Sequence, residues 1–296
     1  MHNVPIFRGV ATALITPLTA SGVDYEAFGR LIDWQIEEGI NALVIAGTTG
    51  EGATLSDQEH RDVMKFAAER AAGRIPMIAG TGSNDVAYAT DLSKYACEIG
   101  YDAVLLVSPY YNKTTQKGLI ASFEAVADAI DKKVILYNVP SRTGINIEPA
   151  TIAALAKHPN IAAVKEANGN ISKIVETSML TDGEDFCMYS GNDDQIVPIL
   201  SMGGQGVISV LSNVAPKLAL EICDRFFRGD IAGAAAVQKK ALSLINALFC
   251  ETNPIPVKAA MAALGWCENY VRLPLVCMDK DHEEHMLGLM KELGLL

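Results

Sequence analysis

The sequence predicts an α/β fold, a (β/α)8 barrel followed by a C-terminal helical region. Short apolar segments rich in Val, Ile and Leu alternate with longer amphipathic ones along most of the 296 residues. Continuous hydrophobicity is typical of parallel strands that are covered on both faces. The alternative, a doubly wound sheet, would carry G-x-G-x-x-G after its first strand, and that fingerprint is missing. The predicted strands are Val10–Thr16, Ala42–Gly47, Met77–Gly82, Ala103–Pro109, Val134–Pro140, Ile161–Ala167, Cys187–Asn192 and Gly206–Val210.

The segments between these strands have the pattern of crossover helices. Tyr25–Glu38 is amphipathic, and Gly39 follows it as a C-terminal stop. Ser56 and Glu59 have the spacing of a capping box, so we expect a helix to begin there.

The strand pattern ends near Arg228, and only helical segments follow: Ile231–Phe249, Pro256–Leu264 and Glu283–Leu293. We therefore predict a (β/α)8 barrel over residues 1–228 and a C-terminal helical region over residues 229–296.

Composition limits the classes of partner. Lys and Arg number 24 against 35 Asp and Glu, a net charge of −11, which argues against nucleic acid or an anionic membrane as a partner. The six cysteines form no C-x-x-C pair, and no Cys or His cluster has the spacing of metal ligands, so we expect no metal. The sequence has neither a signal peptide nor an apolar run of about 20 residues, and we expect a cytoplasmic protein.

Lys165 is the most informative polar residue, because it stands near the C-terminal end of a predicted strand, where barrel enzymes place their active sites. Two interpretations remain open on the pattern alone. The side chain extends to the rim beside Glu166, or it is a desolvated amine that forms an imine with a carbonyl substrate.

Gly47–Gly52 follows the second predicted strand and reads Gly-Thr-Thr-Gly-Glu-Gly. Its N–H groups and the hydroxyls of Thr48 and Thr49 could hold an anion such as a keto-acid carboxylate. The Gly-Lys-Ser/Thr ending of a nucleotide-binding P-loop is missing, which disfavours a nucleotide. The alternative is an ordinary glycine-rich turn.

Other polar side chains follow the fourth and fifth strands. Tyr137 is either a core residue or a proton carrier, and Arg142 follows a proline on a loop where it could clamp a carboxylate. Tyr110 and Tyr111 add two hydroxyls at the same end. The histidines lie away from the strand ends, which leaves hydroxyl groups to move protons.

Together these segments resemble one family over essentially the whole chain, Val4 to Leu296. The chain is similar to the dihydrodipicolinate synthase family, which also contains N-acetylneuraminate lyase. The Arg142 position resembles the synthase branch, since the sialic acid lyases typically lack this arginine. The motifs are Gly47-Thr-Thr-Gly-Glu51, Tyr137-Asn-Val-Pro-Ser-Arg-Thr-Gly144, Val164-Lys-Glu-Ala167, Gly206-Val-Ile-Ser209 and Asn253-Pro-Ile-Pro-Val-Lys258.

The resemblance implies a lyase that condenses pyruvate with L-aspartate 4-semialdehyde in diaminopimelate and lysine biosynthesis. It implies a pyruvate imine on Lys165 and no cofactor. By the family pattern, Tyr137, Thr48 and Tyr111 form a hydroxyl relay for protons, with Tyr111 entering the site of a neighbouring subunit. The active unit is then a homo-oligomer, usually a tetramer.

The same resemblance implies the groups that bind the substrates. Thr49 holds the pyruvate carboxylate, Arg142 binds the carboxylate of the semialdehyde, and Gly191 and Ile208 border the pocket. Two other functions stay open: another pyruvate-dependent aldolase, such as a sialic acid or ketodeoxysugar acid lyase, and a barrel that binds a keto acid without catalysis.

Some members of this family are inhibited by lysine, and here the chain departs from them. Asn84, Tyr110 and His60 match polar positions of their lysine pocket. Tyr88 stands in place of a glutamate that faces the ligand ammonium, and Asp57 replaces a histidine. We therefore predict weak or absent inhibition by L-lysine.

Overall fold

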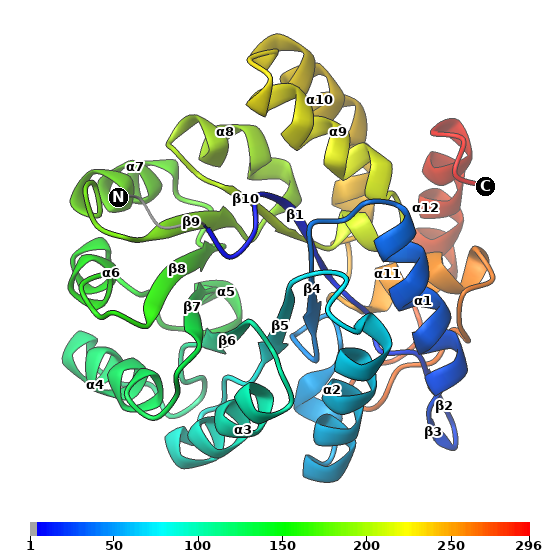
Figure 1. The fold of residues 1–296 in the computed structure, drawn as a ribbon. Coiled ribbons are helices and arrows are strands. Elements are labelled where there is room, and N and C mark those ends of the chain that lie inside the picture. Colours follow the sequence, from blue (N-terminus) through cyan, green and yellow to red (C-terminus); the bar gives the residue numbers. More distant parts are fainter. Residues whose placement is uncertain (1–4) are drawn as a thin grey trace.

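Eight parallel strands form a closed barrel in the computed structural model, which describes residues 5–296 (Figure 1). Around the barrel the strands follow the order β1-β10-β9-β8-β7-β6-β5-β4, and β4 pairs again with β1. The predicted fold is confirmed. The strands are β1 Gly9–Ala13, β4 Ala42–Ile45, β5 Met77–Gly80, β6 Ala103–Val107, β7 Lys133–Asn138, β8 Ile161–Glu166, β9 Cys187–Ser190 and β10 Gly206–Ser209.

Helices surround the barrel and connect its strands (Figure 1). Ser56 and Glu59 form the predicted capping box at the start of α2, and Gly39 follows α1 with a positive φ of 86°. The connecting helices are α1 Tyr25–Glu37, α2 Asp57–Ala71, α3 Val86–Glu98, α4 Gln116–Ala127, α5 Pro140–Thr143, α6 Pro149–Leu155, α7 Ile171–Leu180 and α8 Ile196–Ser201, and α9 Pro216–Phe227 follows the last strand.

The predicted strands extend one to three residues too far at their C-terminal ends, because the apolar runs continue into the loops. Thr16, predicted as strand, instead donates a hydrogen bond from its hydroxyl to the carbonyl of Gly50 at 2.7 Å. A small hairpin of β2 (Leu18–Thr19) and β3 (Gly22–Val23) was not predicted. Two-residue strands are too short to show a period of hydrophobicity.

Two apolar cores hold the barrel together. One lies between strands and helices, and the other fills the barrel interior with alternate strand residues that include Ile78, Ile135 and Ile208. Tyr189 of β9 stacks on Phe7 with ring centroids 4.1 Å apart and donates a hydrogen bond to its carbonyl at 2.8 Å. The segment before β1 is thereby fixed to the barrel interior.

Three helices follow the barrel: α10 Ile231–Ala247, α11 Ile255–Ala263 and α12 Lys280–Glu292. Figure 1 shows α11 and α12 on the same side of the barrel as α1. Trp266, after α11, stacks on Trp34 of α1 with ring centroids 4.7 Å apart. Within residues 5–296, no helix combines the length and apolar character needed to cross a bilayer.

Candidate active site

A cavity of about 440 Å³ lies at the C-terminal ends of β4, β5, β6 and β7. Three of the predicted site residues line it: Thr48, Tyr137 and Arg142. His60 and Asn253 also line it. His60 was expected only at a lysine pocket and Asn253 only as part of a family motif, so neither was predicted as a residue of the substrate site. The cavity therefore lies where a barrel enzyme places its active site.

Lys165 lies on β8 beside Tyr137 of β7, and the two residues are direct partners in the strand register. The lysine is 5% exposed, and its Nζ lies 4.3 Å from the centroid of the Tyr137 ring. Among residues 5–296 its ammonium has neither an ion pair nor a hydrogen bond. The amine is thus buried against an aromatic face, and no anion from the described part of the chain is bound to it.

Gly191 and Ile208 were both predicted to border the pocket. Gly191 lies near this lysine, and Ile208 lies within the barrel interior. A Cβ on Gly191 would come 3.2 Å from Cγ of Lys165 and 2.8 Å from Cβ of Ala167, so the close approach requires glycine. Ile208 belongs to the interior core that also contains Tyr137.

Asp193 is a carboxylate near the site that the sequence analysis missed. Its Oδ2 accepts hydrogen bonds from the backbone N–H groups of Val210 and Leu211, both at 2.9 Å. Burial raises the pKa of Asp193, although these hydrogen bonds and the positive charge of Lys165 oppose the shift. An aspartate two positions after Gly191 was the only sequence signal for it.

The glycine-rich loop after β4 folds back tightly. Glu51 has a left-handed backbone (φ 53°), and a Cβ on Gly52 would come 2.2 Å from the carbonyl oxygen of Ala46. Thr48 is half-buried on the cavity, and Thr49 is buried. The Thr49 hydroxyl accepts a hydrogen bond from Nδ2 of Asn253 at 3.1 Å. Thr48 therefore lines the cavity and Thr49 is bonded to Asn253, and their role as an anion cradle stays a prediction.

Arg142 lies on the short helix α5, which begins with Pro140. Its Nη2 donates a hydrogen bond to the backbone carbonyl of Asn253 at 2.9 Å. The guanidinium is exposed at the cavity, where it could meet a carboxylate. Asn253 thus contacts both residues that were predicted to bind substrate carboxylates.

Tyr111 is separated from the other predicted catalytic residues. Its side chain is 93% exposed, and its backbone has a positive φ of 67°. The neighbouring Tyr110 lines the cavity. Within one chain, Lys165 and Tyr137 are therefore in contact, Thr48 lies on the same cavity, and Tyr111 points into solvent.

Glu166 follows Lys165 and faces away from the barrel interior, as alternate strand residues do. Its carboxylate accepts hydrogen bonds from Nδ2 of Asn138 at 3.0 and 3.1 Å and from the N–H of Asn168 at 2.8 Å. Burial nevertheless raises its pKa to about 7. Asn138 also accepts a hydrogen bond from the N–H of Ile147, which ties the segment after α5 to β7.

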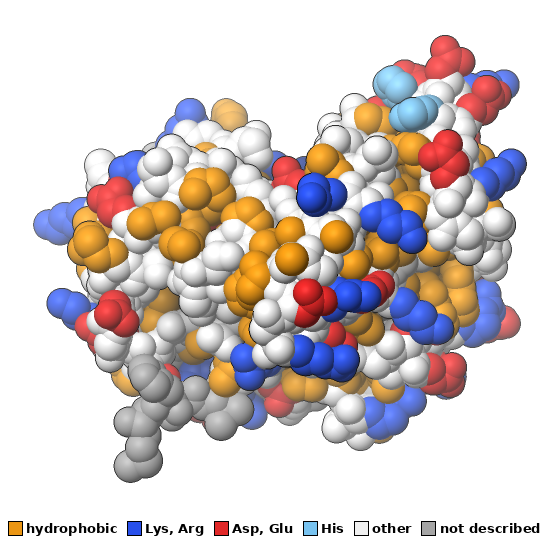
Figure 2. All heavy atoms as spheres, turned by 90° about the horizontal axis from the view of Figure 1, so that it is seen from above, with side chains coloured by type: hydrophobic (Ala, Val, Ile, Leu, Met, Phe, Trp, Pro, Cys, Tyr) orange, Lys and Arg blue, Asp and Glu red, His pale blue; other side chains and the backbone are white. Residues whose placement is uncertain are grey.

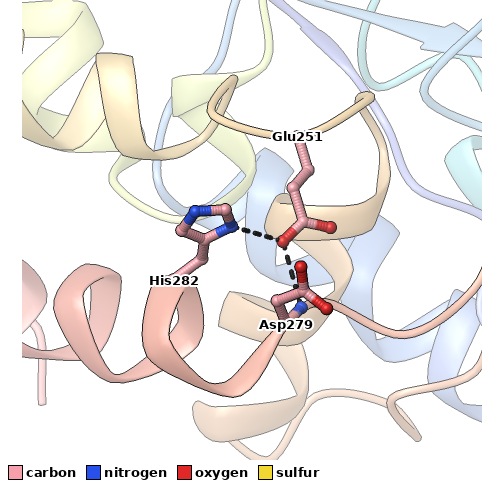
Figure 3. A group of neighbouring side chains, drawn as sticks. All are labelled: Glu251, Asp279 and His282. Atoms are coloured by element: carbon pink, nitrogen blue, oxygen red, sulfur yellow. Dashed lines mark hydrogen bonds and ion pairs between the residues drawn. The ribbon is translucent and has the colours of Figure 1, made fainter.

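A separate cluster of Glu251, Asp279 and His282 lies outside the cavity (Figure 3). Glu251 Oε1 accepts hydrogen bonds from the N–H of Asp279 at 3.0 Å and from Nδ1 of His282 at 2.7 Å. The Glu251 carboxylate raises the pKa of His282. These bonds cap the N-terminus of α12, whose partial positive charge favours an anion, so we interpret the cluster as a helix cap.

The face of the molecule seen from above carries charged side chains of both signs (Figure 2). On the face in Figure 2, Lys and Arg side chains are interspersed with Asp and Glu rather than gathered in one continuous positive region.

The closed (β/α)8 barrel has a buried lysine beside a tyrosine, close to a glycine-rich loop that carries hydroxyl groups. These features define a barrel with a lysine-centred site. The model of the dihydrodipicolinate synthetase family matches residues 6–293. The chain therefore belongs to this family, as its motifs predicted.

Comparisons with individual relatives give the same family. The chain is 49% identical over 292 residues to the 4-hydroxy-tetrahydrodipicolinate synthase of Acetivibrio thermocellus, covering 99% of each chain. A crystal structure of dihydrodipicolinate synthase from Thermotoga maritima superposes with a TM-score of 0.96 at 43% identity, covering 98% of this chain and 100% of that one. A monomeric dihydrodipicolinate synthase variant superposes with a TM-score of 0.96 at 44% identity, covering 98% of each chain.

Proposed function

We propose that this chain is a lyase with 4-hydroxy-tetrahydrodipicolinate synthase activity, condensing pyruvate with L-aspartate 4-semialdehyde. The names of its full-length relatives support this assignment. The observation that carries the mechanism is Lys165, a buried amine in contact with Tyr137 and without an anionic partner among residues 5–296. A non-catalytic keto-acid binder would have no need of such an amine.

In the proposed reaction, the covalent intermediates form on Lys165. Lys165 Nζ attacks the keto carbon of pyruvate, and loss of water leaves an imine that tautomerises to an enamine. The enamine carbon forms a bond with the aldehyde carbon of the second substrate. The substrate amine then attacks the imine carbon, which closes the ring and releases Lys165. No cofactor takes part in this sequence.

Tyr137 and Thr48 are placed to move the protons that these steps require. Tyr137 contacts Lys165, and both hydroxyl-bearing residues line the cavity. Hydroxyl groups that are held in position can relay protons that an isolated tyrosine would move slowly. In this proposal Thr49 and loop N–H groups bind the pyruvate carboxylate, and Arg142 binds that of the semialdehyde.

Tyr111 supports an oligomeric active unit. Its 93% exposure and positive φ present the hydroxyl to the outside of the chain rather than to its own cavity. We propose that it completes the relay in a neighbouring copy, within a dimer or a tetramer built from dimers. The expected cytoplasmic location stays a prediction.

A coupled assay tests the function: the chain should consume pyruvate only when L-aspartate 4-semialdehyde is present. Turnover of N-acetylneuraminate or a ketodeoxysugar acid instead would contradict it. Arg142→Ala separates the two branches further. It should impair use of the semialdehyde about ten- to a hundredfold, because a charged bidentate contact contributes roughly 1.5–3 kcal/mol, while imine formation with pyruvate survives.

A further inference from the structure

Lys258 is fully buried in α11, outside the set of residues that line the cavity. Its Nζ forms an ion pair with Oε1 of Glu51, whose side chain is also fully buried, and donates a hydrogen bond to the carbonyl of Tyr270 at 2.9 Å. The proposed chemistry uses neither residue. A buried ion pair needs a reason other than reactivity, since desolvating two charges is costly.

Glu51 belongs to the same turn as the two threonines of the anion cradle. Its N–H donates to the carbonyl of Thr48 at 3.1 Å, and its own backbone is left-handed, which is strained for a residue other than glycine. Such a conformation persists only where surrounding contacts over-determine it. The side chain supplies those contacts, because Oε2 also accepts the N–H of Arg272 at 3.1 Å.

The C-terminal region holds the loop at further points. Asn253 Nδ2 donates to the Thr49 hydroxyl, and the Arg272 guanidinium donates to the carbonyl of Thr54 at 3.0 Å and to both carboxylate oxygens of Glu59. Contacts from residues 253–272 therefore reach the loop at Thr49, Glu51 and Thr54.

We propose that Lys258 is a positioning residue for substrate binding: through Glu51 it fixes the Thr48–Thr49 turn in the geometry that receives the keto-acid carboxylate. The C-terminal region is thus part of the pyruvate site rather than an appendage. This inference rests on the proposed function, because it takes pyruvate as the anion that the loop binds.

The position of a binding loop affects substrate affinity more than the chemical step once substrate is bound. Lys258→Met keeps the length of the apolar stem and removes the charge. Glu51→Gln keeps the shape of the carboxyl group and breaks the pair from the other side. Both variants should raise the KM for pyruvate about ten- to a hundredfold, change kcat at saturating pyruvate about threefold or less, and leave the KM for the semialdehyde within about threefold.

Leu244→Ala, an apolar truncation in the buried face of α10, is the control that distinguishes a general loss of stability from a specific effect on pyruvate binding. At a temperature where all variants are folded by circular dichroism, this control should keep the wild-type KM for pyruvate. Lys258→Arg, which retains the positive charge, should recover part of the affinity that Lys258→Met loses.

The outcomes decide between the alternatives. A folded Lys258→Met or Glu51→Gln with wild-type KM for pyruvate overturns the proposal, as does an equal rise in Leu244→Ala. If neither pair variant folds, the pair serves the whole fold and the positioning role is likewise overturned. Borohydride trapping of pyruvate on wild-type Lys165 keeps the proposed function separate: its absence contradicts that function, whereas its presence with an unchanged variant KM contradicts only this inference.

Discussion

Two buried lysines of this chain, Lys165 in the barrel and Lys258 in the C-terminal region, differ in the partners that surround them. Lys258 is enclosed by the Glu51 carboxylate and the Tyr270 carbonyl, whereas Lys165 lies on the Tyr137 ring with no anion bound to it from residues 5–296. Burial lowers the pKa of Lys258, and the Glu51 carboxylate opposes that shift. Burial alone therefore does not identify a nucleophile, because an amine that is held by a carboxylate is not free to attack a carbonyl carbon.

The largest expected effect follows from this difference. Lys165→Ala should lower kcat by about three orders of magnitude or more, because electrostatic binding cannot replace a covalent intermediate. Lys258→Met should retain kcat within about threefold at saturating pyruvate. Steady-state rates in the coupled assay measure both. A Lys165→Ala variant that keeps more than about a tenth of wild-type kcat would remove the distinction between the two lysines.

For stability, the order of the two lysine positions should be reversed, with the larger loss at Lys258. Lys258→Met leaves Glu51 as an unpaired buried carboxylate, so the free energy of unfolding should fall by about 3–5 kcal/mol. Lys165→Met removes a buried amine that has no ion pair among residues 5–296 and should cost less stability than Lys258→Met. Urea denaturation of both variants gives the values. Equal losses in the two variants would contradict the contrast.

Glu166 lies on the outer face of β8, the strand that also carries Lys165. Burial raises its pKa to about 7, whereas in the unfolded chain the pKa is near 4.5. Between these values the native state holds a proton that the unfolded chain has lost. Stability from this group is therefore complete below about pH 4.5 and is lost as pH rises through about 7, a total of about 3 kcal/mol.

Glu166→Gln cannot titrate and should lack this component. The difference in free energy of unfolding between wild type and Glu166→Gln should thus shift by about 3 kcal/mol against wild type from pH 4.5 to pH 8. Urea unfolding at four pH values measures it. A difference that does not change with pH would show that Glu166 titrates as in the unfolded chain.

The smallest effect concerns free lysine as a ligand. The ion pair of Lys258 with Glu51 shows that a buried ammonium is stabilised by a carboxylate. At the position where lysine-sensitive relatives carry a glutamate for the ligand ammonium, this cavity is lined by Tyr88. The nearby Asp57 carboxylate is already engaged by Nε of Arg61 at 3.1 Å, and the pKa of Asp57 is lowered mainly by that bond. In a lysine titration of initial rates, half-inhibition should lie above about 1 mM, or roughly 4 kcal/mol of binding.

The barrel was predictable from sequence because strands buried on both faces are apolar throughout, so all eight were located within a few residues. Their ends were not, since the apolar run of β1 continues to Ile15 beyond the last paired residue, Ala13. Long amphipathic helices such as α10 were also evident. A hairpin of two-residue strands leaves no such pattern.

The site was only partly predictable for a physical reason. Lys165 and Tyr137 lie near the C-terminal ends of strands and Thr48 follows one, and strand ends converge in a barrel, so their proximity could be inferred. Asn253 and Lys258 reach the glycine loop from a helical region that is distant in sequence, and no local pattern encodes which turn a buried charge will meet. Tyr111 could be assigned a role only by family resemblance.

The central claim is that Lys165, and not the more deeply buried Lys258, carries the substrate. Incubation with pyruvate followed by borohydride reduction, proteolysis and mass spectrometry tests it most directly. The reduced three-carbon adduct should appear on the peptide that contains Val164–Glu166, and the peptide that contains Lys258 should remain unmodified. An adduct on Lys258 or another lysine, or no adduct at all, would contradict the account.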